Sequence, residues 1–259
     1  MAKEEAIQLE GAVTEVDDIM PVRAVIFDMD GVIVDSEPYS MQALIDTLGM
    51  LAEKTGGLLS TTLPARGLFH DDPFCIGISG SFTPEVGLEL LAQADLVVAV
   101  GCSLAYHAGG GGQLWPKAKM LQVDIDPVAV SQGQEVARHH LRADARLGVE
   151  ALTEALPPRK GAWRSDAMAA RVRDAKPDSH VFEIEPGLLD PREVVEALEK
   201  ALPRDWEMVN SSGHCSWFFA QMPSRPQENF LTIREFGAIG IGVSFAMGVA
   251  AARPDRPVV

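Results

Sequence analysis

The 259-residue sequence has few cysteines, no long apolar run and no surplus of basic residues. Its three cysteines, Cys75, Cys102 and Cys215, are far apart and form no Cys-x-x-Cys pair, which argues against a disulfide framework and a clustered zinc site. No run of about 18 apolar residues is present, and the acidic start Met-Ala-Lys-Glu-Glu is unlike a secretory signal. We therefore expect a cytoplasmic protein with no membrane partner.

The charge is strongly acidic, with a formal net charge of -15 at pH 7. Such a field repels the phosphate backbone, so we expect no nucleic-acid partner. Hydrophobic residues make up 47% of the chain, enough to bury a core in one or two domains. An enzyme that acts on a small molecule fits this composition better than a nucleic-acid-binding protein.

Residues 1–20 are predicted to form a leader containing one strand. Ile7, Leu9, Val13 and Val16 recur at roughly every second position, as on a strand with one buried face. The opening MAKEEAIQLEGAV resembles the first strand of bacterial translation initiation factor one, a small barrel. The other strands and the basic surface of such a barrel do not follow, which speaks against RNA binding and leaves a simple leader or edge strand as the alternative.

Residues 21–50 contain a buried strand, Ala24–Phe27, with carboxylates at its end. This segment resembles haloacid dehalogenase-like phosphatases and mutases of the β-phosphoglucomutase-like branch, through Asp28, Asp30, Gly31, Asp35, Ser36 and Glu37. The resemblance implies that Asp28 is a nucleophile, that Asp30 is a general acid and base, and that both lie at a Mg2+ site. The family's later Ser or Thr, Lys and acidic pair are not found after Met50. A phosphatase or phosphomutase is therefore an alternative function.

Residues 51–157 alternate between strand and helix patterns. Strands are predicted at 57–62, 94–100 and 119–125, and helices at 84–93 and 128–137. This alternation is typical of α/β proteins with a doubly wound parallel sheet. The segments TTLPARGLFHDDP, ADLVVAVGCSL and LQVDIDP resemble the central domain of thiamine-diphosphate-dependent enzymes of the acetolactate synthase type.

The carboxyl ends of these strands provide a candidate nucleotide site. Gly101, Ser103, Asp124 and Asp126 follow strands whose carboxyl ends border the crevice where nucleotides bind in such sheets. The resemblance implies FAD or ADP at this place. An equally weighted alternative is that the two aspartates only close a strand and cap the next helix at Pro127. The Gly109–Gly112 run lacks the Gly-x-Gly-x-x-Gly spacing and is interpreted as a flexible loop.

Residues 158–189 are predicted to be a linker with one short helix near 166–174, and residues 190–259 to be a second, truncated α/β domain. Asp190 and Pro191 are typical of a helix N-cap followed by proline at the first position. An apolar stripe along one face of this helix follows, formed by Val194, Val195, Leu198, Ala201 and Leu202.

Two later segments, NSSGHCSWFFAQ and REFGAIGIGVSFAMGVAAA, resemble the diphosphate-binding domain of the same thiamine enzymes. The resemblance implies that Gly213 and His214 approach the cofactor diphosphate, and that Gly237 and Ala238 offer backbone groups to its aminopyrimidine ring. Ile239 would support the thiazolium ring and hold the cofactor bent. The alternative is that His214 is a capping or surface histidine and that the glycines serve helix packing.

The resemblance implies an enzyme that uses thiamine diphosphate and Mg2+ to decarboxylate a 2-oxo acid and to pass the product to an acceptor. The family's Gly-Asp-Gly and Asn metal ligands and its catalytic glutamate are not found in the sequence, so no catalytic or metal set is intact and little turnover is expected. A non-catalytic nucleotide-binding or structural module is a third hypothesis. The apolar helix at 246–252 predicts homo-oligomers or aggregates, and the change of pattern near Met50 indicates a chimera.

Overall fold

The computed structural model describes residues 38–127, 130–131, 134–135, 137–157, 163–222, 225–232 and 237–259. The predicted leader and the carboxylates Asp28 and Asp30 lie outside the described residues. We call residues 38–174 the central unit. Its elements are α1 (Pro38–Thr55), β1 (Leu59–Thr61), β2 (Cys75–Ile78), α2 (Glu85–Leu91), β3 (Leu96–Val100), α3 (Tyr106–Gly109), η1 (Gly110–Gly112), β4 (Lys119–Asp124), β5 (Val130–Ser131), β6 (Gln134–Glu135), β7 (His139–Arg142), α4 (Ala145–Ala155) and α5 (Asp166–Asp174).

The centre of this unit is a parallel sheet in the order β3-β4-β7, beside a second parallel pair, β1-β2. Side chains of β3 alternate between two apolar clusters. Val97 and Ala99 belong to one cluster, and Val98 and Val100 to the other. Because successive residues of a strand point to opposite faces, the strand is buried on both sides, as expected for a parallel sheet covered by helices.

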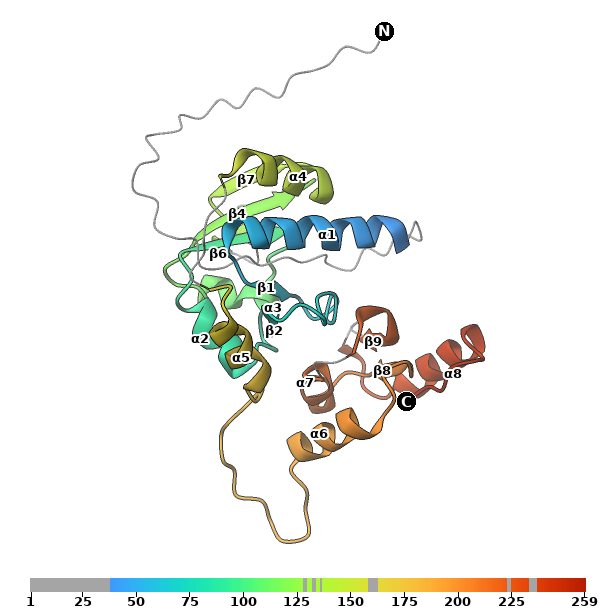
Figure 1. The fold of residues 1–259 in the computed structure, drawn as a ribbon. Helices are drawn as coiled ribbons and strands as arrows, with labels where there is room; N and C mark the ends of the chain where they lie inside the picture. The colour runs from blue at the N-terminus through green and yellow to red at the C-terminus, as the bar shows by residue number, and fades with distance from the viewer. Residues whose placement is uncertain are drawn as a thin grey trace.

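Helices cover both faces of this sheet (Figure 1). One cluster joins buried residues of α1 and α4 to the sheet, and the other joins α2, with half-buried residues of α5, to the opposite face. The predicted doubly wound α/β fold is confirmed. None of the helices in the described part of the chain is both long and apolar enough to cross a membrane.

Helix α1 passes through residues 50–51, where the sequence predicted a division between two segments. Leu44 and Leu48 lie before this position and Leu51 after it, and all three belong to the same buried cluster as Leu59 of β1. The residues of α1 on both sides of the predicted boundary therefore pack against the central sheet.

The prediction of a helix at 128–137 is wrong. The described residues of this segment form the short antiparallel strands β5 and β6. Val128, Val130 and Val136 are β-branched and Gly133 interrupts the segment, a composition that disfavours helix and suits a hairpin. The predicted strands at 57–62, 94–100 and 119–125 correspond to β1, β3 and β4, and the short helix near 166–174 is α5.

The remaining elements form the C-terminal unit, residues 191–259. Strands β8 and β9 are parallel, and the end of the chain pairs beside β8, where Val209 N donates to the carbonyl of Val259 at 2.7 Å. The expected N-cap is confirmed, since Asp190 accepts a hydrogen bond from Arg192 N and Pro191 begins the helix. The elements are α6 (Pro191–Ala201), β8 (Met208–Asn210), α7 (His214–Ala220), η2 (Gln227–Asn229), β9 (Phe230–Thr232) and α8 (Gly242–Ala252).

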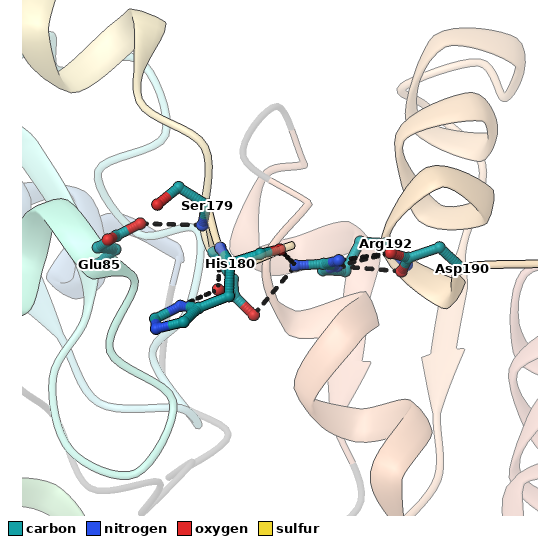
Figure 2. Close-up of polar contacts among 6 residues, drawn as sticks. Glu85, Ser179, His180, Asp190 and Arg192 are labelled. Atoms are coloured by element: carbon teal, nitrogen blue, oxygen red, sulfur yellow. Dashed lines mark hydrogen bonds and ion pairs between the residues drawn. The ribbon is translucent and has the colours of Figure 1, made fainter. Parts of the chain in front are cut away.

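The connecting segment, residues 175–190, is held at both ends by charged side chains (Figure 2). At the central unit, Glu85 of α2 accepts a hydrogen bond from Ser179 N at 2.9 Å. Towards α6, Arg192 lies 3.3 Å from a carboxylate oxygen of Asp178 and also binds Asp190. These contacts fix the segment without burying it in an apolar core.

We expect these contacts to weaken in acid. Hydrogen bonding from Ser179 lowers the pKa of Glu85, the backbone N–H of His180 lowers that of Asp178, and the Arg192 side chain lowers that of Asp190. Carboxylates whose pKa is lowered in the folded state stabilise it above their ordinary values of 4.5 and 3.8, and this contribution is lost as the pH falls through the lowered values.

Hydrogen exchange, normalised to the intrinsic rate, should therefore show protection of residues 177–180 near neutrality that is lost as the pH falls through the lowered pKa values of these carboxylates. Glu85→Gln should loosen the Ser179 end at neutral pH. Equal protection near neutrality and below these pKa values would show that these carboxylates do not hold the segment.

Candidate functional site

Two loops meet at the carboxyl end of the parallel strands β8 and β9. Strand β8 continues into the loop 211–213, and α7 begins at His214. The first residue of α8 lies against this loop, because a Cβ placed on Gly242 would be 3.0 Å from the Cβ of Ser211. The structure therefore brings the segment around His214 and the segment before α8 to the same edge of the sheet.

The backbone at this edge adopts conformations that favour glycine. Gly213 has φ +119°, Gly237 has φ +61° and Gly240 has φ +91°. Gly213 and His214 are exposed where α7 begins, so the imidazole and nearby backbone N–H groups are accessible to a ligand. This position agrees with a surface histidine and with a diphosphate contact.

Sequence reasoning missed two hydroxyl groups at this edge. Among the described residues, Ser211 Oγ and Thr232 Oγ1 are buried atoms with no hydrogen-bond partner. They follow β8 and end β9, respectively, whose carboxyl ends are adjacent. A buried hydroxyl without a partner is costly, and a polar ligand at this edge would satisfy it. The polar run Asn210 to Ser212, where β8 ends, was the signal available in the sequence.

The predicted ring-binding residues are open to solvent. A Cβ placed on Gly237 would meet no atom within 4 Å, Ala238 is half-buried, and Ile239 is 80% exposed. These three residues precede α8, whose first residue, Gly242, contacts Ser211 in the loop after β8. They offer backbone groups and one apolar side chain to a ligand.

The predicted nucleotide residues lie at the carboxyl edge of the β3-β4-β7 sheet. Gly101 follows β3 with φ +61° and donates its N–H to Val123. Ser103 is exposed two residues later. Asp124 ends β4 and accepts a hydrogen bond from the backbone N–H of Asp126 at 2.9 Å, so its carboxylate closes a local turn.

Asp126 itself is exposed at this edge, and its carboxylate is 3.7 Å from the Arg142 guanidinium at the end of β7. The structure thus brings the four predicted residues to one edge, as the sheet topology requires. It gives Asp124 the turn-closing role that the sequence had left open, although the described residues that follow Pro127 form the strands β5 and β6 rather than a helix.

The chemistry of the described residues favours anion binding over metal binding at the β8-β9 edge. No group of three or more His, Cys, Asp or Glu side chains comes together in the described ranges, so they provide no protein ligand set for a metal ion. Hydroxyls, an imidazole and backbone N–H groups are instead donors suited to phosphate oxygens. Two surface hollows lie elsewhere, one beside Arg253 and Arg256 and one beside Trp115 and Lys119.

Comparisons with known proteins find a family match for most of the central unit. Residues 36–152 match the family described as thiamine pyrophosphate enzyme, central domain. The chain is 27% identical to the acetolactate synthase large subunit of Parasynechococcus marenigrum, over 83% of this chain and 35% of that protein.

It is 30% identical to a probable 2-ketoarginine decarboxylase of Pseudomonas aeruginosa, over 82% of this chain and 37% of that protein. It is also 30% identical to a putative acetolactate synthase large subunit of Mycobacterium tuberculosis, over 80% of this chain and 38% of that protein. The chain thus spans 35–38% of the length of these curated relatives. It is related to thiamine pyrophosphate enzymes of the acetolactate synthase-like kind.

Proposed function

We propose that this chain, a relative of thiamine pyrophosphate enzymes, binds the diphosphate of thiamine diphosphate at the β8-β9 edge. In this proposal the chain belongs to an enzyme that acts on a 2-oxo acid. The observation that carries the proposal is the pair of buried hydroxyls without partners, Ser211 and Thr232, at the carboxyl end of two parallel strands. Anionic ligands of open α/β sheets bind at this end.

Each residue of the edge has a defined task in this proposal. Ser211 and Thr232 donate their hydroxyl hydrogens to phosphate oxygens, and His214 adds a further donor. Gly213 has no side chain, so the ligand can approach its backbone closely. Gly237 and Ala238 offer backbone groups to the aminopyrimidine ring, and Ile239 supports the thiazolium ring. The bound cofactor would supply a carbon nucleophile for the 2-oxo group.

We expect the chain by itself to turn over little substrate. Mg2+ accompanies the cofactor in the family resemblance, yet the described residues bring together no ligand set for it, so we assign no step to the metal. Ile239 is 80% exposed, which leaves the ring position in water rather than in a dry site. Binding through hydrogen bonds without these supports predicts a dissociation constant of about 0.1–1 mM.

Titration with inorganic pyrophosphate tests the proposed edge. Ser211→Ala should weaken pyrophosphate binding about 10- to 100-fold, because a charge-assisted hydrogen bond contributes about 1.5–3 kcal/mol. Ser103→Ala is the matched control at the other sheet edge and should leave binding unchanged. A larger loss with Ser103→Ala than with Ser211→Ala would move the anion site to the central unit.

The central edge is the second candidate site, for FAD or ADP. The exposed carboxylate of Asp126, beside Arg142, is suited to a ribose hydroxyl. If the protein retains FAD or ADP during purification, Asp126→Ala should abolish this retention without changing pyrophosphate binding. The phosphatase alternative at Asp28 and Asp30 rests on sequence alone, and Mg2+-dependent release of phosphate that Asp28→Asn abolishes would support it.

We also expect self-association through α8. Val243 and Met247 of this helix are 72% and 69% exposed, Phe245 is 42% exposed, and no α8 residue within Gly242–Ala252 is buried. Apolar surface of this kind favours oligomers. Sedimentation velocity should show a concentration-dependent increase in mass, reduced by Phe245→Ser with Met247→Ser. A monomer at all concentrations would remove this expectation.

A further inference from the structure

One buried side chain, Arg66, joins the central unit to the C-terminal unit. It lies in the loop between β1 and β2 and is 4% exposed. Its guanidinium donates to three backbone carbonyls of the C-terminal unit. Nε is 3.2 Å from the carbonyl oxygen of Ala220, Nη1 is 2.9 Å from that of Arg225, and Nη2 donates to that of Met222.

The residues around Arg66 allow close contact between the two units. The Phe230 ring of β9 lies under the guanidinium, with 4.0 Å from Cζ to the ring centroid. The next residue, Gly67, has φ +85°, and a Cβ there would stand 2.5 Å from the Arg225 carbonyl oxygen. A hydrogen bond that does not involve Arg66 crosses the same interface, from Gln221 Nε2 to the carbonyl oxygen of Phe82 at 2.7 Å.

Arg66 keeps its charge in this setting. Burial lowers its pKa to about 10, with Glu199 opposing the shift, so the guanidinium remains protonated at neutral pH. A buried guanidinium must have its N–H groups satisfied, and here backbone carbonyls accept them. Three carbonyls in fixed directions match the planar fork of arginine better than the single ammonium of lysine.

The contacts of Arg66 lie at the end of α7 opposite to His214. Helix α7 has seven residues, about 10 Å at 1.5 Å per residue, and Ala220 is its last. Backbone hydrogen bonds join the turns of this short helix, so we expect a contact that fixes its end to restrain its start as well. Asn210 adds to this, since its side chain donates to the carbonyl oxygen of Ser216 and ties α7 to β8.

We propose that Arg66 is a positioning residue of the central unit that holds α7 so that Gly213 and His214 stand at the β8-β9 edge. This inference rests on the proposed diphosphate site and extends it, because it assigns to the central unit a direct part in shaping that site. Arg66 itself lies at the opposite end of α7 and does not touch the ligand in this proposal.

Hydrogen exchange and pyrophosphate titration of Arg66→Met, in the full chain, test the proposal together. We expect about tenfold faster exchange in residues 213–222 and about tenfold weaker pyrophosphate binding. Arg66→Lys should recover only part of both effects. The matched control is Arg164→Met, since Arg164 also binds a carbonyl and stacks on a phenylalanine, but within the central unit.

The possible results separate the two claims. Faster exchange in 213–222 with unchanged pyrophosphate binding would overturn the positioning role, as would unchanged exchange in Arg66→Met. Equal losses in Arg164→Met would mark the effect as general loss of stability and also overturn it. If the unmodified chain binds no pyrophosphate, the proposed function fails, and the exchange result still reports whether Arg66 holds α7.

Discussion

Replacing Gly80 by alanine should destabilise the central unit by about 3 kcal/mol, because strain and overlap add at this position. Gly80 follows β2 with φ +110°, a conformation that side chains rarely adopt. A Cβ there would lie 1.8 Å from the carbonyl oxygen of His107 in α3. The same carbonyl accepts the N–H of Ser81, so relief of the overlap would break this link between the loops after β2 and β3.

Urea unfolding followed by tryptophan fluorescence measures the loss, since Trp115 lies in the core of the same unit. Gly187→Ala is the matched control, because Gly187 also has positive φ, +88°, but a Cβ there meets nothing within 4 Å. It should cost only the conformational strain, about 1 kcal/mol. Equal effects of the two substitutions would show that the loop after β2 is not held against α3.

Leu48→Ala should lower the free energy of unfolding by about 3 kcal/mol, within the range measured when a buried leucine is truncated. Leu48 is 2% exposed and lies in the cluster that joins α1 to β1, β3 and α4. It also precedes Met50, where the sequence predicted the end of a haloacid dehalogenase-like segment. The substitution therefore measures whether this part of the chain stabilises the central unit.

Leu189→Ala provides the comparison, because Leu189 is 76% exposed in the connecting segment and its truncation should change stability by less than about 0.5 kcal/mol. The denaturation midpoint of each variant gives the result. If Leu48→Ala were as mild as Leu189→Ala, α1 would contribute little to the central core, and the boundary at Met50 would regain support.

Local sequence patterns predicted those elements whose signals are themselves local. The proline after Asp190 marked the start of α6, and the apolar run at 94–100 marked β3, because capping and buried strands depend on adjacent residues. Strand β7 was missed, since His139 to Arg142 is polar and pairs with β4 only in the folded sheet. The helix predicted at 128–137 is wrong because Val128, Val130 and Val136 do not recur at a helical spacing, and the described residues form β5 and β6.

The candidate site was predictable only in part, because only some of its features are determined by adjacent residues in the sequence. Residues such as Gly101 and Asp124 follow strands, so topology alone places them at a carboxyl edge. The unpaired hydroxyls of Ser211 and Thr232 depend on which atoms surround them. The role of Arg66 depends on carbonyls more than 150 positions away in the sequence, which no local pattern reveals.

The most direct test of the central claim is a calorimetric titration of the full chain with thiamine diphosphate and Mg2+, beside separate titrations with FAD and ADP. We predict saturable binding of thiamine diphosphate in the range of about 0.1–1 mM, displaced by inorganic pyrophosphate and weakened by Ser211→Ala. No saturable heat with millimolar thiamine diphosphate, or binding that pyrophosphate does not displace, would contradict the assignment of the β8-β9 edge as a diphosphate site.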